Sequence, residues 1–513
     1  MPVRAPEPLR AARRRLRARR GYAAFVDAVE PGLLAHTRVH RFAAPPVTGD
    51  PAPEPVAVWV APGEGAQATR ASLARQTVAP AAVLAGDAAA ALAATRAPWV
   101  LLLRAGDTLA PVALERLGQG AALAPDAALV TCDEDLAGRR APRLRPGPAP
   151  DHALAGGLAG APLCVRPAAA LAAGPEPGEV MALRLAGPDG AGHAHVPLVL
   201  VHRAALEAPR ADVRAILPPG ARAEPAAGHW RRIRRPLAAE PRVEVVVPTR
   251  DHAALLERCA RTVLGATAWE RLGLCVVDNG SSDPAVAALL ARLARDARVR
   301  VIRNPRPFNF PALVNGAAVT SAADVIVLLN DDTEVLDAGW IETLAEEAVR
   351  PEVGAVAPLL LYPDGRVQQA GAAIGLWGTA GHPFAGLDPW RPTPFGAAED
   401  ATRNWLAVSA ACLAVERHKL LAAGGLDEAL AVAGNDVDLG LRLTAAGHRS
   451  LCVPHARLLH HEGASRGQSF APGDLERSRE CYAPWLAAGD PFYHPALTLR
   501  ATSCALRGPD ERP

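Results

Sequence analysis

Two carboxylates stand side by side where an apolar segment ends. Residues 325–329 have the sequence VIVLL, and Asn330, Asp331, Asp332 and Thr333 follow directly. Adjacent carboxylates at the end of a buried strand repel each other and lose solvation, and a divalent cation is the usual means of keeping them ionised. A cation held by one or two carboxylates also leaves positions for substrate phosphates. The segment predicts a site for Mg²⁺ or Mn²⁺, with capping of the following helix as the alternative.

A second pair of carboxylates, Asp436 and Asp438, begins the segment NDVDLGLRLTAAGHR. Its apolar spacing predicts an amphipathic helix, and the partial positive charge of a helix N-terminus stabilises anions. Asp436 is the better candidate for a general base that points away from the helix. Asp438 is expected on the acceptor side of such a site, together with Trp405. Ordinary helix capping is again the alternative.

Two histidines follow a strand-like segment in LLHHEGASRG, residues 458–467. His460 or His461 could complete the metal shell. His460 is favoured, because two histidines beside Glu462 come after a carboxylate pair. A lone histidine is more often structural, and this remains the alternative. Arg466 is predicted to contact a diphosphate.

Polar residues also follow two earlier apolar segments. VEVVV (243–247) leads into the sequence PTRD, and LCVVD (274–278) leads into NGSSD. In an open parallel sheet, ligands bind beyond the carboxyl ends of the strands. A carboxylate next to backbone rich in Gly and Ser suits a nucleoside, because it accepts hydrogen bonds from base or ribose. The alternative is a simple turn whose Ser or Asp caps the next helix.

The elements that position these motifs alternate between short apolar strands and Ala-rich helices, which predicts an α/β fold with a mainly parallel sheet. The alternation occurs twice, so we expect two Rossmann-like domains in tandem. The predicted division is a basic N-terminal helix (1–35), a linker (36–54), a first domain (55–205), a Pro/Arg-rich linker (206–240), a catalytic domain (241–485) and a C-terminal tail (486–513).

The two blocks resemble each other, which indicates an internal duplication. LLLRAGDTLAP in the first occupies the place of VLLNDDTEVLD in the second, and SLARQT that of CARTVLGAT. The first block keeps Asp107 and the acidic run 133–135, but it has no counterpart of NDVDLGLRL or HHEGASRG. We therefore expect it to be degenerate and catalytically silent, positioning an acceptor or a partner. Two unrelated α/β domains are the alternative.

Composition excludes several classes of protein. The formal net charge of +2 offers no global field for nucleic acid, and eight cysteines without a CxxC pair indicate reduced thiols. No apolar run approaches the roughly 18–20 residues that span a bilayer. We therefore expect a cytoplasmic protein. The Arg-rich helix within residues 7–30 suits peripheral contact with the inner membrane surface, with a solvated or docked arm as the alternative.

Taken in order, these motifs resemble family 2 glycosyltransferases with a GT-A fold, and most of all the rhamnosyltransferase-like members that build bacterial surface polysaccharides. The motifs are PTRDH, VDNGSSD, PFNF, LLNDDTEV, YPDGRVQQAG, GGLDE, NDVDLGLRL and HHEGASRG. The resemblance is close over residues 241–500 and looser over 55–205. It implies an inverting transfer of sugar from a nucleotide-diphosphate donor to a glycan or lipid-linked glycan, with dTDP-rhamnose as the first donor to consider.

The resemblance also implies roles for single residues. It places the metal at Asp332 and His460, makes Asp436 the catalytic base, and assigns the nucleotide-sugar to Pro248, Thr249, Asp251, Asp278, Asn279, Asp331 and Arg466. The sequence departs from the usual motifs at Asn330, at Asn435 and at Ala410. A non-catalytic, nucleotide-sugar-binding scaffold in a polysaccharide assembly complex remains the alternative function. A nucleotidyltransferase is disfavoured, because PTRDH is not a Gly-rich phosphate loop.

Overall fold

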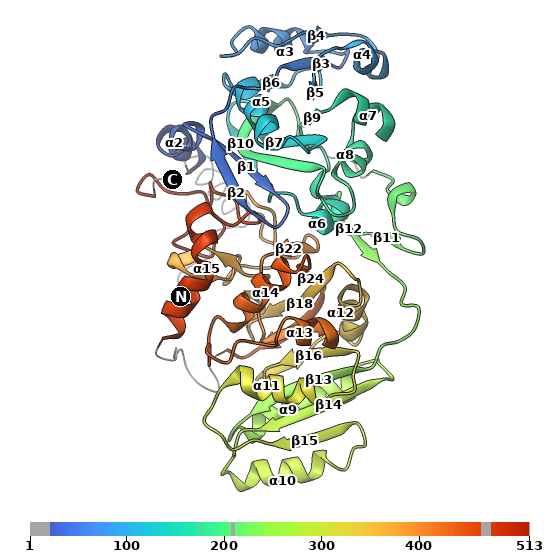
Figure 1. Cartoon of the computed structure of the whole chain (residues 1–513), viewed down its shortest axis with the longest axis vertical. Helices are drawn as coiled ribbons and strands as arrows, with labels where there is room; N and C mark the ends of the chain where they lie inside the picture. Colours follow the sequence, from blue (N-terminus) through green and yellow to red (C-terminus); the bar gives the residue numbers. More distant parts are fainter. Residues whose placement is uncertain (1–20, 175, 207–210, 463–472, 512–513) are drawn as a thin grey trace, which may run out of the picture. The chain divides into compact units, whose positions relative to one another are not determined.

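The structure is a computed structural model of the 513-residue chain, and it describes residues 21–174, 176–206, 211–462 and 473–511. Contacts divide the chain, drawn in Figure 1, into two compact units. Unit 1 consists of Met1–Ile216, Pro392–Gly396 and Pro491–Pro513, and unit 2 of Leu217–Arg391 and Ala397–Asp490.

Unit 2 is built on a ten-stranded mixed sheet. Strand β13 (Val243–Thr249) lies between two parallel neighbours, β14 (Leu272–Asp278) and β16 (Val325–Leu329). The antiparallel strand β23 (Cys412–Glu416) separates β16 from a second parallel pair, β18 (Val353–Leu361) and β24 (Arg449–His460). The other strands of the sheet are β15 (Val299–Arg303), β17 (Thr333–Val335), β19 (Val367–Gln369) and β22 (Arg403–Trp405).

The helices of unit 2 connect and cover these strands. Every residue of β16 and β18 is buried, as expected for strands that are covered on both faces. Two helices start where the sequence predicts, because Asp283 and Asn309 cap them and a proline occupies the first turn. The helices are α9 (Ala253–Ala266), α10 (Pro284–Leu293), α11 (Phe310–Val319), α12 (Trp340–Ala348), α13 (Arg417–Ala422), α14 (Asn435–Ala445) and α15 (Asp474–Ala488).

Two short hairpins complete unit 2. β20 (Ala373–Ile374) pairs with β21 (Ala380–Gly381) around the 3₁₀ turn η3 (Leu376–Gly378). β11 (Arg222–Pro225) pairs with β12 (Arg231–Arg234), and Arg234 of this hairpin forms an ion pair with Glu346 on α12 at 2.6 Å. The predicted linker 206–240 therefore contains a hairpin that is fastened to unit 2.

Unit 1 has a ten-stranded mixed sheet of its own. The strands are β1 (Thr37–Arg41), β2 (Ala44–Gly49), β3 (Val56–Val60), β4 (Val83–Leu84), β5 (Trp99–Leu103), β6 (Thr108–Leu109), β7 (Leu129–Leu136), β8 (Arg140–Arg143), β9 (Leu163–Val165) and β10 (His193–Arg203). The helical segments are α2 (Glu30–Leu34), α3 (Ala66–Leu73), α4 (Ala88–Ala94), α5 (Ala113–Leu123), α6 (Pro150–His152), η1 (Ala153–Gly157), α7 (Pro167–Ala173), α8 (Glu179–Ala186) and η2 (Arg214–Ile216).

The two sheets share one pairing scheme. In unit 1, β3 lies between parallel β4 and β5, antiparallel β9 follows β5, and β7 and β10 form a second parallel pair. Unit 2 repeats each pairing with β13, β14, β16, β23, β18 and β24. The short strands β6 and β17 are also equivalent, because each pairs antiparallel with the last long strand. This agreement is what a duplicated domain would produce.

Three predictions about organisation need correction. Both sheets are mixed rather than mainly parallel, because an antiparallel strand lies in the middle of each. Residues 36–54 are not a linker, since β1 and β2 pair with each other and β1 extends the sheet along β10. Residues 491–513 are not a separate tail but part of unit 1.

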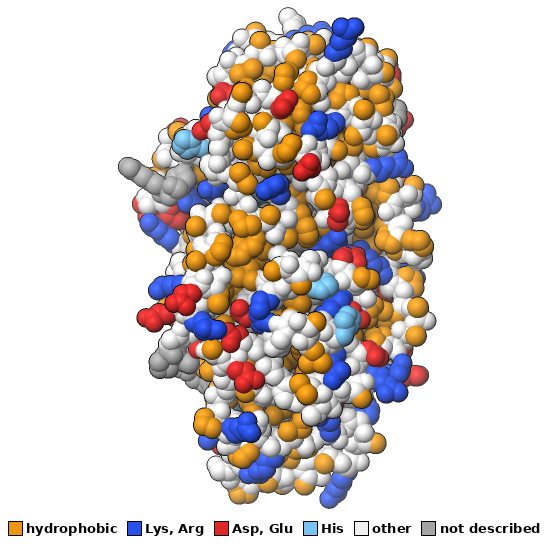
Figure 2. Space-filling view, in the orientation of Figure 1, with side chains coloured by type: hydrophobic (Ala, Val, Ile, Leu, Met, Phe, Trp, Pro, Cys, Tyr) orange, Lys and Arg blue, Asp and Glu red, His pale blue; other side chains and the backbone are white. Residues whose placement is uncertain are grey.

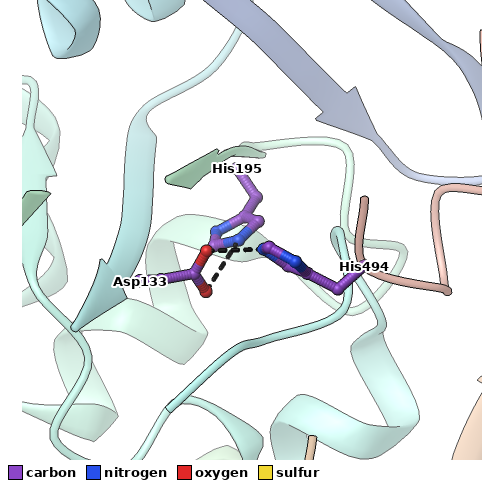
Figure 3. Close-up of side chains that lie close together, drawn as sticks. All are labelled: Asp133, His195 and His494. Carbon is purple, nitrogen blue, oxygen red and sulfur yellow. Dashed lines mark hydrogen bonds and ion pairs between the residues drawn. The ribbon is translucent and has the colours of Figure 1, made fainter. Parts of the chain in front are cut away.

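A buried polar cluster attaches this C-terminal segment to unit 1. Nε2 of His494 lies 2.7 Å from Oδ2 of Asp133, and Nε2 of His195 lies 3.4 Å from Oδ1 of the same carboxylate (Figure 3). Burial alone would raise the pKa of Asp133, but the two histidines outweigh it and the pKa is lowered. The carboxylate is therefore ionised and fully paired within unit 1.

The predicted N-terminal helix is described from residue 21 onward, and residues 21–28 are helical. Tyr22 and Phe25 are buried, and the hydroxyl of Tyr22 donates a hydrogen bond of 2.6 Å to Asp135. The Arg-rich residues before position 21 lie outside the described residues. Within the described ranges, no helix combines the length and apolarity needed to cross a membrane. On the face drawn in Figure 2, basic and acidic side chains are interspersed.

Candidate active site

A cavity of about 390 Å³ in unit 2 collects side chains from four of its elements. Asn330 follows β16, His460 ends β24, residues 409–411 precede β23, and Asp436 lies in the first turn of α14. The cavity thus lies where the sequence analysis places the chemistry. It unites the predicted base Asp436 with His460, one of the two predicted metal ligands.

Asp332 and His460 are neighbours because of the strand register. Thr333 of β17 pairs with His460 of β24, so the residue before Thr333 lies beside the imidazole. Oδ1 of Asp332 lies 3.2 Å from Nε2 of His460, and the two residues are only 4% and 5% exposed. Nδ2 of Asn330 lies 3.3 Å from the same Nε2. One carboxylate and one imidazole, close together and shielded from bulk water, suit a divalent cation.

The two adjacent carboxylates do not share one role. Asp331 is held toward β13, where the hydroxyl of Thr249 donates a hydrogen bond of 2.7 Å to its Oδ2. Asp332 faces β24 and His460 instead. Asp331 therefore joins the sheet-end hydrogen bonds around Thr249, and Asp332 is the carboxylate placed to coordinate a metal.

The carboxylate of Asp436 is fixed by backbone groups. Its Oδ2 accepts a hydrogen bond of 3.1 Å from N of Ala410, and its Oδ1 accepts one of 2.9 Å from N of Val437. Gly434 before it has φ +81°, and a Cβ at that position would overlap the side chain of Ser478 on α15. The residue before the helix must therefore be glycine, which lets α15 pack directly against the start of α14.

A short chain of contacts links the predicted base to the predicted metal ligands. Ala410 binds Asp436, and its neighbour Ala411 accepts a hydrogen bond of 3.0 Å from N of Asn330. Asn330 in turn contacts His460. The antiparallel pairing of β16 and β23 causes this, because it places the end of one strand beside the beginning of the other. Asp436 and His460 are consequently held on one rigid frame.

The residues predicted to bind the nucleoside hold two loops together. Oδ1 of Asp251 accepts hydrogen bonds from N of Ser282 (2.6 Å) and N of Asp283 (2.9 Å), and these backbone donors lower the pKa of the Asp251 carboxyl. Asp251 has φ +55°, a conformation that Asp tolerates better than most residues. Oδ1 of Asp278 accepts a hydrogen bond of 2.8 Å from N of Ser281. Asp251 and Asp278 thus support the same turn after β14.

The remaining members of this group are also built into the loops. Nδ2 of Asn279 donates to the carbonyls of Asn304 and Arg306, both at 2.8 Å. Pro248 lies within β13 opposite Val277. Of the residues predicted at the nucleoside that the structure describes, none lines the 390 Å³ cavity, so the structure brings them to a neighbouring strand end rather than into the cavity itself.

Three predicted site residues need a different account. Asp438 does not face the cavity, because Arg442, one turn later on α14, binds its Oδ2 at 2.6 Å. Trp405 is 2% exposed and lies in β22, which pairs with β24, so it belongs to the interior rather than to an acceptor surface. Arg466 lies outside the described residues.

Sequence reasoning missed one wall of the cavity. Asp474, Ser478 and Tyr482 of α15 line it. Oδ2 of Asp474 accepts from N of Val432 and N of Ala433, both at 2.9 Å, and the Tyr482 hydroxyl donates to the Gly434 carbonyl at 3.1 Å. No local sequence motif predicts these contacts. Glu462, which also lines the cavity, was at least part of the HHEG motif.

Unit 1 keeps a histidine, His202, at the position of His460, but its Nδ1 lies 2.6 Å from Oδ1 of Asp135. A guanidinium lies beside the counterpart of Asp332 instead. Asp107 precedes Thr108, which pairs with His202 of β10, so it is the counterpart of Asp332. Oδ2 of Asp107 lies 2.5 Å from Nη1 of Arg203, and Nε of Arg203 lies 2.7 Å from Oε2 of Glu134. Burial would lower the pKa of Arg203, but Glu134 and Asp107 raise it. A permanent cation thus neutralises both carboxylates.

Among the described residues, one group has the spacing of a metal site, namely Asp133, His195 and His494 in unit 1 (Figure 3). The hydrogen bonds favour a structural role. Nδ1 of His494 accepts the N–H of Ala496 at 3.0 Å, so the ring proton lies on Nε2 and is donated to Asp133. A metal ligand must present an unprotonated nitrogen, which Nε2 then does not offer.

Comparison with known proteins agrees with this geometry. Residues 244–410 match the family described as Glycosyl transferase family 2. The N-acetylglucosaminyl-diphospho-decaprenol L-rhamnosyltransferase of Mycobacterium tuberculosis (strain ATCC 25618 / H37Rv) is 31% identical over 250 residues, which cover 44% of this chain and 78% of that protein. The chain belongs to glycosyltransferase family 2. This confirms the family that the order of motifs indicates.

Other similarities are partial. The O-antigen biosynthesis protein RfbC of Myxococcus xanthus is 38% identical over 467 residues, which cover 82% of this chain but 36% of RfbC. The chain thus spans about a third of the length of this family member. Among solved structures, GalNAc-T7 with UDP, GalNAc and Mn²⁺ is 18% identical with a TM-score of 0.36, covering 44% of each chain. The family match ends at residue 410, so the positions of Asp436 and His460 rest on the geometry above.

Proposed function

We propose that residues 241–485 form an inverting glycosyltransferase domain, which moves a sugar from a nucleotide-diphosphate donor to a hydroxyl of a glycan or lipid-linked glycan. The observation that carries this proposal is a single cavity of unit 2 with Asp436 on its lining and His460, beside Asp332, on the same frame. A single displacement needs a base at the attacking hydroxyl and positive charge at the departing diphosphate. The cavity offers a place for both.

Asp332 and His460 would hold the cation. The chemistry that a divalent cation supplies at such a site is positive charge, which offsets the charge developing on the departing diphosphate. Mg²⁺ takes oxygen ligands, so the imidazole of His460 favours Mn²⁺ over Mg²⁺. Nε2 of His460 is the nitrogen that lies beside Asp332, so it is the one placed to act as a ligand.

Asp436 acts as the general base. The N–H of Ala410 fixes its Oδ2, and the carboxylate takes the acceptor proton as the hydroxyl oxygen attacks the anomeric carbon. General-base catalysis of this kind contributes about 10²–10⁴-fold to the rate. Because the attack comes from the face opposite the leaving group, the product has the inverted anomeric configuration.

The nucleotide would lie over the ends of β13 and β14. Thr249, Asp251, Asp278 and Asn279 shape this edge, and Asp331 supports it through Thr249. Arg466 and Pro248 complete the proposed donor contacts. Since Asp251 and Asp278 already support the turn after β14, their contribution to the donor is mainly to hold backbone groups in place.

A rhamnosyl donor such as dTDP-rhamnose is the first choice. The Mycobacterium tuberculosis relative is named as an L-rhamnosyltransferase acting on a lipid-linked sugar diphosphate, and the Myxococcus xanthus relative as an O-antigen biosynthesis protein. We extend to this chain a role in bacterial surface-polysaccharide synthesis at the cytoplasmic face of the membrane. The basic N-terminal segment would provide peripheral contact with the membrane there.

Unit 1 is proposed to be a degenerate GT-A-like domain. It repeats the strand pairing of unit 2, but Arg203 neutralises Asp107 where unit 2 has its proposed metal ligands. A guanidinium is a donor only and cannot release the carboxylate to a metal at neutral pH. Unit 1 would then serve to position the acceptor or a partner.

The test is an assay of donor hydrolysis and transfer with the full chain. With Mn²⁺ and dTDP-rhamnose, the protein should slowly release dTDP, and a chelator should stop the release. With an acceptor, the glycosidic product should have the anomeric configuration opposite to that of the donor, as measured by NMR.

Three results would contradict the proposal. Release of pyrophosphate from a nucleoside triphosphate and a sugar phosphate would indicate a nucleotidyltransferase. Retention of anomeric configuration would exclude single displacement at Asp436. Donor binding without turnover, under any acceptor, would favour a non-catalytic scaffold.

A further inference from the structure

One wall of the unit 2 cavity is the β20–β21 hairpin. Ala373 pairs with Gly381 and Ile374 with Ala380, and residues 379–382 line the cavity. The hairpin is anchored on both sides. N of Ile374 donates a hydrogen bond of 2.9 Å to Asp490, and Nδ1 of His382 lies 3.0 Å from the Gly371 carbonyl. This wall is therefore a fixed part of the cavity.

Trp377 lies in the turn of this hairpin and is unusual in both its exposure and its backbone conformation. Its side chain is 55% exposed, and its backbone has φ +53°. A positive φ is an outlier for a bulky residue, and such strain persists only where the surrounding structure holds it. An exposed indole also leaves a large apolar area in contact with water. The exposed indole and the strained turn that holds it make Trp377 a candidate for contact with a ligand.

The indole packs over one residue of the cavity wall, although Trp377 does not itself line the cavity. A Cβ added to Gly381 would lie 2.7 Å from Cζ3 of Trp377, so the ring covers the backbone of a residue that lines the cavity. Only glycine at this position leaves room for the ring. Trp377 is thus held against a residue of the cavity wall, with more than half of its surface still open to solvent.

The surrounding groups suit a sugar better than a lipid chain. Gln368, His382, Ser409 and Glu462 line the same cavity and offer hydrogen-bond donors and acceptors. A pyranose ring has an apolar face of C–H groups and a rim of hydroxyls, which match an aromatic surface and a polar lining respectively. A polyprenyl chain could form no hydrogen bonds with these polar groups.

We propose that Trp377 is the platform on which a sugar ring of the acceptor stacks, which directs the acceptor hydroxyl toward Asp436. This inference rests on the proposed function and names the acceptor side of the same cavity. Trp377 is a specificity-determining residue in this account and takes no part in proton transfer.

The experiment compares the full chain with Trp377→Ala, Trp377→Phe and Trp390→Ala. Trp390 is the matched control, because it is also in unit 2 and is 57% exposed. Neither tryptophan lines the cavity, but the ring of Trp377 covers Gly381, which does. The probe is a soluble rhamnose–N-acetylglucosamine disaccharide, and its binding is measured by saturation-transfer NMR in the presence of Mg²⁺ and dTDP.

We expect saturation of the disaccharide C–H protons in the parent protein and in Trp390→Ala. Trp377→Ala should weaken binding about tenfold, and Trp377→Phe should keep most of it. Release of dTDP from dTDP-rhamnose without acceptor should be the same in all four proteins. If the parent protein does not release dTDP, the proposed function is contradicted. If it releases dTDP normally but the disaccharide binds equally well to the parent and to Trp377→Ala, only this inference is contradicted.

Three outcomes would overturn the inference. The disaccharide could fail to bind the parent protein, or it could bind equally well to Trp377→Ala. Vesicles containing polyprenyl phosphate could bind the parent and lose binding in Trp377→Ala while the disaccharide does not, which would identify a lipid chain as the occupant.

Discussion

Two equivalent strand ends of this molecule each carry an aspartate, but the side chain next to the aspartate differs between them. In unit 2, Asp332 lies 3.2 Å from Nε2 of His460. In unit 1, Asp107 lies 2.5 Å from Nη1 of Arg203, which is itself 2% exposed at its side chain. Each aspartate precedes a threonine that pairs with the last long strand of its sheet. The backbone is therefore the same, and the neighbouring side chain makes the difference.

The difference teaches how one fold can keep or lose a metal site. An imidazole offers a lone pair to a metal ion, whereas a guanidinium offers only hydrogen-bond donors. The buried carboxylates of unit 1, Asp107 and Glu134, pair with the guanidinium of Arg203. We infer that this pairing contributes to stability and not to catalysis. Unit 2 leaves Asp332 beside a potential ligand, next to a cavity. We infer that catalysis belongs to unit 2 and that the corresponding network in unit 1 is structural.

The largest expected effect distinguishes two carboxylates on one helix. Asp436→Asn should lower kcat about 10²–10⁴-fold, because the amide cannot take the acceptor proton. Asp438→Asn is the matched control, since its carboxylate binds Arg442 and does not line the cavity. Steady-state kinetics of both variants with saturating donor measure the difference. Equal losses would remove Asp436 from the role of base.

The next prediction concerns the cation of unit 1. Arg203→Met should destabilise the protein by about 3–5 kcal/mol, because Asp107 would remain buried without its guanidinium partner. Glu134 contributes less to this loss, because it keeps Arg145 at 2.8 Å. Turnover per folded molecule should not change. Calorimetric unfolding and donor hydrolysis at low temperature measure the two quantities.

Arg140→Met is the control for this substitution. Arg140 is exposed and, in the described part of the chain, its side chain donates to the Ala137 carbonyl. Its loss should cost less than about 0.5 kcal/mol. A fall in turnover with unchanged stability in Arg203→Met would mean that unit 1 takes part in the reaction.

The last of these predictions concerns the pH dependence of stability. Burial lowers the pKa of His193 to about 3, with His195 and Arg145 adding to the shift, and it lowers the pKa of His40 and His195 as well. The folded protein therefore binds fewer protons than the unfolded chain below about pH 6.5. Stability should fall as the pH decreases from there toward 3, by up to about 1.4 kcal/mol per pH unit for each histidine.

His193→Gln tests this prediction. The amide can still hydrogen-bond to Thr131, which lies 2.7 Å from Nε2 of the imidazole, but it does not titrate. The free energy of unfolding of the variant should depend less steeply on pH between 6.5 and 5 than that of the parent. Identical slopes would show that His193 is not kept neutral by burial.

The sequence predicts the strand ends of the site well, and for a physical reason. Apolar strands that stop at polar residues fix where Asp332 and His460 lie along the chain, and the amphipathic helix pattern fixes Asp436. Sheet pairing then brings the strand ends together. The side of a helix on which a residue lies can also be predicted in part. Residues two apart on a helix point to different sides, so Asp436 and Asp438 could not both face the cavity.

Contacts between distant segments could not be predicted. The hydrogen bond from His494 to Asp133 joins residues 361 positions apart, and neither residue stands in a motif that names the other. The same holds for Tyr482 of α15, which closes the cavity by bonding to Gly434. Trp405 was misplaced because nothing in its sequence reveals that β22 would be covered on joining β24.

The central claim is that catalysis belongs to unit 2 alone, and one measurement tests it most directly. It is the rate at which Asp332→Asn and Asp107→Asn release dTDP from dTDP-rhamnose. Both variants are measured with Mn²⁺, at a temperature where both are folded. We expect Asp332→Asn to lose at least about 10²-fold in rate, since it removes a proposed ligand of the cation. Asp107→Asn should keep the parental rate per folded molecule and lose only stability. A full rate in Asp332→Asn, or a matching loss in Asp107→Asn, would contradict the assignment of catalysis to unit 2 alone.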